Sequence, residues 1–245
     1  MVVACSESGG ENLALVTPTA VTVQTTLPPA ATAETVAPSP STTAPPAYET
    51  PVAHALSEVT IYVAPTVEIE TRTVPAKTIL GTPTVMPVLE GPNNGWVKLS
   101  LPGRPNEASG WARADQLTFA KVDQRIEIDL ATAILTFFDK GQPVLTTAVS
   151  VGSPSNPTPA GEFFVTDIVS LTDPSGPWGP YALGLSARSD TITEFNGGDG
   201  IIGIHGTNRP DRIGQPVSLG CVRVPNEVIA EIARMVQLGI PVSIG

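Results

Sequence analysis

Residues 200–207 read GIIGIHGT and residues 218–223 read SLGCVR. These stretches contain His205 and Cys221, the only histidine and the only cysteine that follow residue 54. A cysteine nucleophile needs a neighbouring base, and histidine is the side chain that titrates near neutral pH. Glycines beside both residues let other backbone approach closely and leave amide groups that can bind an oxyanion. The pair predicts a thiol nucleophile with a histidine base, although each residue alone would fit an inert buried thiol or an unrelated surface histidine.

The sequence around this pair is typical of short strands. Apolar residues at 126, 128 and 130 alternate with charged residues at 125, 127 and 129, which predicts a half-buried strand. Residues 170–184 are rich in proline and glycine and predict a long irregular loop, in which Trp178 and Tyr181 are candidates for a lid. Further strand-forming runs, separated by turn residues, cover residues 133–138, 144–151, 162–168 and 201–204.

One segment near the C-terminus has the pattern of a helix. Asn226 is a candidate N-cap, and apolar residues at 228, 229, 232, 233 and 236 follow with a helical period. Gly239 is placed to end this helix, and Pro241 to prevent its continuation before a closing strand at 242–244. Residues 121–245 are therefore predicted to form a mainly β domain with one short helix.

Residues 56–120 predict a separate small β module. Their β-rich runs show no helical period and lie within one strand length of each other, which indicates a small antiparallel barrel. GWVKL at 95–99 and GWARA at 110–114 form an approximate repeat, and the module resembles bacterial SH3-like modules. Its tryptophans Trp96 and Trp111 could form a ligand platform, but small domains more commonly use such aromatics in the core. The runs are residues 59–63, 67–74, 84–89, 95–101 and 110–117.

Residues 1–55 predict a disordered or polyproline-like stalk. They contain no lysine or arginine and are rich in threonine, proline and alanine, so they offer little apolar surface to bury. Residues 2–5 read VVAC and resemble the site at which bacterial lipoproteins are cleaved and lipidated, but only four residues precede Cys5. Either Cys5 is a lipid anchor whose signal peptide begins further upstream, or it is an incidental thiol.

The composition excludes several classes of function. A net charge of −10 and a pI near 4.6 argue against a nucleic-acid partner, whose phosphates require lysine and arginine. Two cysteines and two histidines are too few for a four-cysteine zinc site or a multi-histidine metal centre. The acidic residues of 121–245 are scattered, which gives no case for paired-carboxylate glycoside hydrolysis.

The glycine-flanked His205 and the pattern Ser218-x-Gly220-Cys221-x-Arg223 closely resemble the signature of the L,D-transpeptidase (YkuD-like) catalytic domain. The resemblance covers residues 122–245 and implies a β-sandwich catalytic domain. Leu219 departs from the pattern, since the family usually has histidine or asparagine there. Four other stretches add to the resemblance: SVG at 150–152, TPAG at 158–161, GPYAL at 179–183 and GIIGI at 200–204.

The resemblance also implies roles for individual residues. Cys221 would be the nucleophile and His205 its base and later its acid. The backbone of Gly206 and Thr207 would orient the imidazole. Ser218 would brace the site by hydrogen bonding. The amides near Gly220 and Cys221 would hold the oxyanion, and the candidates for substrate contact are Arg223, Trp178 and Tyr181.

The activity implied is peptidoglycan cross-linking. The thiolate would attack the L,D-peptide bond after the third residue of a tetrapeptide stem and release D-alanine, and an amine of a second stem would resolve the thioester to a 3→3 link. Carbapenems would acylate the same thiol. Such an enzyme would need no metal or organic cofactor and would be exported to the cell envelope. Two alternatives stay open: an L,D-carboxypeptidase that uses water as acceptor, and a non-catalytic protein that binds the cell wall.

Overall fold

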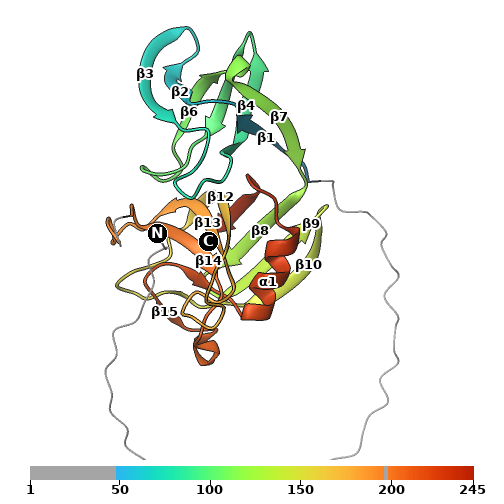
Figure 1. The fold of residues 1–245 in the computed structure, drawn as a ribbon, viewed down its shortest axis with the longest axis vertical. Helices are drawn as coiled ribbons and strands as arrows, with labels where there is room; N and C mark the ends of the chain where they lie inside the picture. The colour runs from blue at the N-terminus through green and yellow to red at the C-terminus, as the bar shows by residue number, and fades with distance from the viewer. Residues whose placement is uncertain (1–47, 196–197) are drawn as a thin grey trace, which may run out of the picture. The chain divides into compact units, whose positions relative to one another are not determined.

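The computed structural model describes residues 48–195 and 198–245 (Figure 1). Most of the predicted stalk, with Cys5, lies outside these residues. In the part of the chain that is described, no helix is long and apolar enough to cross a membrane.

The first sheet consists of seven strands from residues 50–122, in the order β3-β2-β6-β5-β4-β1-β7. β1 lies between β4 and β7, and its residues Val52 and Ala53 are buried. The prediction that the stalk extends to residue 55 is therefore wrong for residues 50–55. The resemblance of this part to SH3-like modules stays a prediction. The strands are β1 (Thr50–Ala55), β2 (Val59–Ala64), β3 (Val67–Val74), β4 (Val85–Asn93), β5 (Trp96–Ser100), β6 (Ser109–Arg113) and β7 (Leu117–Val122).

The two stretches of the GW repeat form neighbouring antiparallel strands, β5 and β6, with Lys98 opposite Trp111. Trp96 is buried, its ring meets that of Tyr62 edge to face at 5.2 Å, and the Arg113 guanidinium lies 4.1 Å from its centre. Trp96 is thus a core aromatic, as small domains commonly use this residue type.

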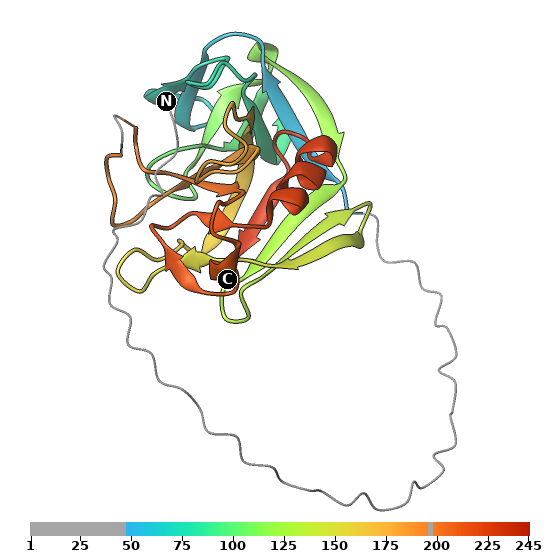
Figure 2. The same cartoon turned by 60° about the horizontal axis from the view of Figure 1, so that its bottom comes forward.

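The second sheet has eight strands in the order β10-β9-β8-β17-β12-β13-β14-β16 (Figures 1 and 2). β17 lies parallel to β8 and antiparallel to β12, and β14 lies parallel to β16. The prediction of a mainly β domain with one short helix is confirmed. The strands are β8 (Gln124–Asp129), β9 (Ile134–Asp139), β10 (Gln142–Ala148), β12 (Gly161–Ser170), β13 (Tyr181–Arg188), β14 (Ile201–His205), β16 (Val222–Arg223) and β17 (Pro241–Ile244).

The helix, α1 (Asn226–Met235), packs against β13 and β14. Its Ile229 and Ile232 are fully buried and belong to the core of the second sheet, as the helical period predicts. The helix ends at Met235 rather than at Gly239. Gly239 has a φ of +78° and serves the turn into β17, where a Cβ atom would come within 2.7 Å of a Val85 methyl group.

The predicted loop over 170–184 is too long by five residues, because residue 170 belongs to β12 and residues 181–184 belong to β13. Tyr181–Arg188 is strand β13, so the irregular loop covers only residues 171–180. All residues from Ala182 to Ala187 are buried, because neighbouring elements cover both faces of the strand. A strand buried on both faces shows no alternation of polar and apolar residues, which hid it from a pattern analysis.

Candidate active site

The structure brings the predicted nucleophile and base to adjacent strand ends. β14 ends at His205, and Cys221 directly precedes β16; the register pairs Ile204 with Val222 and His205 with Arg223. Side chains alternate between the faces of a sheet, so His205 and Cys221 share the face opposite the Ile204–Val222 pair. Strand spacing and rise place their Cα atoms about 8 Å apart. Both side chains are fully buried.

The imidazole of His205 is oriented by its own backbone. Its Nδ1 lies 2.6 Å from the Gly206 carbonyl oxygen. A carbonyl can only accept, so Nδ1 carries the proton and donates it to Gly206, which leaves the lone pair on Nε2. Nε2 is buried and has no hydrogen-bond partner in the described residues. A backbone carbonyl therefore does what a carboxylate does in a triad, and Nε2 can accept a proton from a thiol.

The turn after His205 is held by a side chain of the helix. The Thr207 N–H donates to Asn226 Oδ1 at 2.7 Å, and Thr207 Oγ1 accepts from the Arg209 N–H at 3.0 Å. Asn226 was predicted to be the N-cap of α1, which is wrong: the N-cap is Pro225, and Asn226 bonds to Thr207 instead. Sequence reasoning missed Asn226 as a residue of the site, because a capping pattern looks the same whichever N–H the side chain binds.

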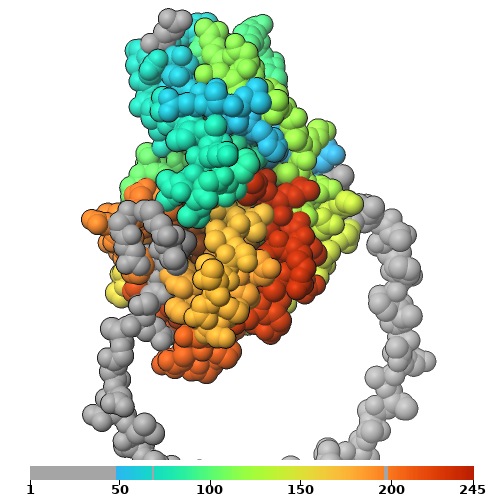
Figure 3. All heavy atoms as spheres, viewed as in Figure 1, coloured from blue at the N-terminus to red at the C-terminus, as the bar shows by residue number. Residues whose placement is uncertain are grey.

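Residues 171–180 cover the histidine. The ring of Trp178 lies 4.5 Å from that of His205, at an interplanar angle of 43°. Gly179, with a φ of +64°, packs directly on Gly206; a Cβ atom on either glycine would come within 2.3 Å of Asn226 Oδ1. In Figure 3 the segment that contains residues 171–180 is coloured amber, and it lies against the red surface of the C-terminal helix. Trp178 therefore contacts the base itself, as a lid candidate should.

Ser218 braces the loop that carries the nucleophile. Its hydroxyl donates to the Cys221 carbonyl at 2.5 Å and accepts from the Gly220 N–H at 3.1 Å. The predicted bracing role of Ser218 agrees with these contacts. The Gly220 amide, however, was expected to bind an oxyanion, and in this structure it is already bonded to Ser218. The Cys221 amide stays the candidate oxyanion donor.

Thr158 holds the same loop from the other side, a contact that sequence reasoning missed. Its Oγ1 donates to the Gly220 carbonyl and accepts from the Gly152 N–H, both at 2.8 Å. Gly152 belongs to β11 (Val151–Gly152), which pairs with β15 (Pro216–Ser218). A Cβ atom on Gly152 would come within 2.3 Å of the Asn156 carbonyl oxygen, so only glycine fits there. In the sequence, the threonine of the TPAG stretch was the residue that could have indicated this contact.

The two remaining candidates lie next to the base. Arg223 is 4% exposed and is paired with His205 in register, so its side chain lies on the face that carries His205 and Cys221. Its backbone exchanges two 2.9 Å hydrogen bonds with Ser150. Tyr181 accepts from the Gly206 N–H through its carbonyl at 3.3 Å, and its half-buried side chain packs against the core. A role for either side chain in binding substrate stays a prediction.

This arrangement suits acyl transfer through a thiol. It combines a buried thiol, an imidazole with a free Nε2 lone pair, and a brace that fixes the backbone at Cys221. Among residues 48–195 and 198–245, no three histidine, cysteine, aspartate or glutamate side chains cluster closely enough to hold a metal ion.

Residues 123–244 are similar to proteins of one known family. The family model of the L,D-transpeptidase catalytic domain (YkuD) matches residues 123–244. Over 123 residues, 50% of this chain, the sequence is 35% identical to YkuD of Bacillus licheniformis and 33% identical to YkuD of Bacillus subtilis; the match spans 66% of each relative. A crystal structure of an Enterococcus faecium L,D-transpeptidase mutant aligns with a TM-score of 0.40 and 24% identity, covering 50% of this chain and 49% of that one.

Proposed function

Through residues 123–244 the chain belongs to the L,D-transpeptidase (YkuD) family, and we propose that it cross-links peptidoglycan by a cysteine thioester. The observation that carries the proposal is the unpartnered, buried Nε2 of His205 on the face of the sheet that also carries Cys221. The substrates would be stem peptides, which place the enzyme in the cell envelope.

The first half of the reaction would form the thioester. The Cys221 Sγ–H proton passes to His205 Nε2, and the sulfur attacks the carbonyl carbon after the third residue of a tetrapeptide stem. The negative charge that develops on the carbonyl oxygen faces the Cys221 amide. His205 then returns the proton to the departing amine, so D-alanine leaves as the C–N bond breaks. The Nδ1–H···O=C bond to Gly206 stabilises the transient imidazolium.

The second half would transfer the acyl group. The side-chain amine of a second stem attacks the thioester carbon and gives one proton to His205, which protonates Cys221 sulfur as the C–S bond breaks. With water in place of the amine, the same steps give a tripeptide and an L,D-carboxypeptidase activity. Trp178 lies over the imidazole and limits the access of water to it.

The test is incubation with purified disaccharide-tetrapeptide, followed by mass spectrometry. We expect 3→3 dimers and free D-alanine from the wild type and neither from Cys221→Ala. Glu127→Ala, a change at the exposed partner of the Arg125–Glu127 ion pair of β8, is the matched control and should keep full turnover. Tripeptide without dimers would replace the transpeptidase by the carboxypeptidase, and turnover by Cys221→Ala would contradict the mechanism.

A second test uses a carbapenem. Imipenem should add its full mass to the wild-type chain, with the adduct on the peptide that contains Cys221, because ring opening by the thiol loses no atoms. The Cys221→Ala chain should gain no mass. An adduct at another residue, or none on the wild type, would contradict the proposed nucleophile.

A further inference from the structure

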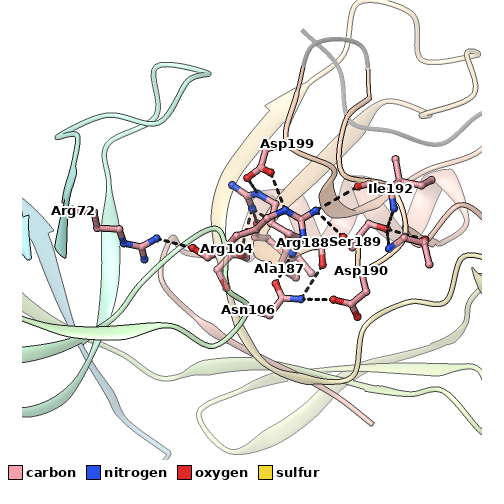
Figure 4. A network of polar contacts seen from close by, with 12 residues as sticks. Arg72, Arg104, Asn106, Ala187, Arg188, Ser189, Asp190, Ile192 and Asp199 are labelled. Carbon is pink, nitrogen blue, oxygen red and sulfur yellow. Dashed lines mark hydrogen bonds and ion pairs between the residues drawn. The ribbon is translucent and has the colours of Figure 1, made fainter. Parts of the chain in front are cut away.

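The loop that joins β5 to β6 extends from the first sheet to the end of β13 (Figure 4). The Arg104 guanidinium donates from Nη2 to the Ser189 carbonyl at 2.7 Å and from Nε to Asp199 Oδ1 at 3.1 Å. Two residues later, the Asn106 side chain donates to the Arg188 carbonyl at 2.9 Å and accepts from the Arg188 N–H at 2.8 Å. The loop therefore binds the backbone at the end of β13 as well as a side chain.

The backbone around Arg104 is itself held from both sheets. Arg72 of β3 donates from Nη1 to the Arg104 carbonyl at 3.2 Å, and the Gly103 N–H donates to the Ser186 carbonyl at 3.0 Å. The Arg104 side chain is 35% exposed, so its hydrogen bonds are partly shielded from water. Its guanidinium thus starts from a fixed point and can hold its acceptors in place.

Asp199 links two cations at this position. Its Oδ2 accepts from Arg188 Nε at 2.9 Å, while its Oδ1 accepts from Arg104. The Arg188 side chain is 13% exposed; burial lowers the pKa of Arg188, and the hydrogen bond and charge of Asp199 oppose that shift. Without the Asp199 carboxylate, the two guanidinium groups would repel each other, and the Asp167 charge would be the remaining opposing effect on Arg188.

One of the residues that Arg104 holds, Ser189, lies near Gly220. Ser189 is 2% exposed, and its Oγ lies 3.9 Å from the position that a Cβ atom would take on Gly220. Thr191 Oγ1 donates to Asn156 Oδ1 at 3.1 Å, in the loop that also bonds to the Gly220 carbonyl. Arg104 thus bonds to Ser189, and the Ser189 hydroxyl lies near Gly220, which directly precedes Cys221.

We propose that Arg104, a residue of the loop between β5 and β6, is a positioning residue for thioester formation at Cys221. By holding the Ser189 carbonyl and Asp199, it fixes the wall of the site that contains Ser189, whose hydroxyl lies near Gly220. A displacement of that wall moves the sulfur relative to His205, and small misplacements in an active site cost large factors in rate. The inference depends on the proposed function, because it assigns Arg104 to the step in which the thioester forms.

The experiment compares the wild type with Arg104→Ala and Arg104→Lys in the full chain. Lys98→Ala is the matched control, since Lys98 pairs with Glu90 on the same sheet, away from this network. Three quantities are measured: the rate of imipenem acylation by mass, the rate of Cys221 alkylation by iodoacetamide from pH 5 to 10, and the melting temperature. We expect Arg104→Ala to slow acylation on the order of tenfold to a hundredfold, and Lys98→Ala to leave it unchanged.

The lysine variant separates positioning from charge. Lysine keeps the pairing with Asp199 but lacks the fork that also reaches Ser189, so it should restore only part of the rate. Arg104→Ala should also change the pH profile of alkylation at temperatures well below its melting point, which a merely structural contact would not do. Equal acylation and alkylation in Arg104→Ala and wild type would overturn the proposal.

The proposal can also be tested if Arg104→Ala does not fold or if imipenem does not acylate the wild type. If Arg104→Ala does not fold, Asp199→Asn removes the charge with little change of shape and should slow acylation in the same way; a wild-type rate in that variant would overturn the proposal. If imipenem does not acylate the wild type, the proposed function fails, and the alkylation profiles still decide whether Arg104 positions the thiol.

Discussion

Asn226 provides a sharp test of how the base is held. In Asn226→Ala the Thr207 N–H loses its acceptor at 2.7 Å, and Thr207 is only 4% exposed. An unsatisfied buried donor costs about 1–3 kcal/mol. Because Asn226 itself is only half-buried, water can replace part of the lost bond, so we expect a loss of about 1–2 kcal/mol in the free energy of unfolding.

The loss should also reach the chemistry. Without Asn226 Oδ1, the turn over His205, Gly206 and Thr207 is free to shift, and the Nδ1–H bond to the Gly206 carbonyl shifts with it. We expect imipenem acylation to slow on the order of tenfold. Urea denaturation gives the stability, and a mass-based time course gives the rate.

Asn226→Asp is the control. It keeps an acceptor oxygen for Thr207 and places a negative charge in the first turn of α1, where such a charge is favourable. Its free energy of unfolding in urea should be at least as high as that of the wild type. A stability loss equal to that of Asn226→Ala, or a loss below about 0.5 kcal/mol in the alanine variant, would refute the reasoning.

Three other changes have definite expected results. Gly179→Ala has to adopt a φ of +64° and places a Cβ atom 2.7 Å from the Gly206 Cα. It should lower the free energy of unfolding, measured by urea denaturation, by about 2–4 kcal/mol. Ala160→Gly, at an exposed position, is the control and should not show such a loss. Thr158→Val leaves the Gly220 carbonyl and the Gly152 N–H without their Thr158 partner, so the free energy of unfolding should fall by about 2 kcal/mol or more. Thr158→Ser keeps the hydroxyl and should keep most of the stability. Equal losses in the two variants would contradict a role for the hydroxyl. Hydrogen bonds from Thr132 and, to a smaller extent, from Ala131 lower the pKa of Asp129, so its charge stabilises the folded state above the unfolded pKa of about 3.9. The difference in the free energy of unfolding between wild type and Asp129→Asn should therefore shrink as the pH falls below that value. A difference that stays constant with pH would contradict the assignment.

The parts of the fold that follow a local pattern were predictable. Alternation located β8, and a helical period located α1 with its buried Ile229 and Ile232. β13 has no alternation because both of its faces are covered, and β1 follows a proline-rich tract whose composition hides a short strand. Both strands depend on neighbours that are distant in the sequence, which local patterns cannot show.

The site divides in the same way. Residue type and glycine context singled out His205 and Cys221, since few side chains can supply a nucleophile and a base. The contacts of Asn226 with Thr207 and of Thr158 with Gly220 join residues 19 and 62 positions apart, and nothing local predicts them. The bond between Ser218 and the Gly220 amide was equally invisible, because the same residues could have left that amide open.

The place of β17 has a consequence for folding. β8 and β12 do not pair with each other; both pair with β17, which comes last in the order of the chain and lies between them. Until residues 241–244 have been synthesised, the β8–β10 strands and the strands that carry His205 and Cys221 are two separate half-sheets with unpaired edges. Long-range pairing of this kind is slow to form. During synthesis the surroundings of the thiol are therefore incomplete until β17 has been made, and an incomplete chain would expose two sheet edges that can pair with other chains.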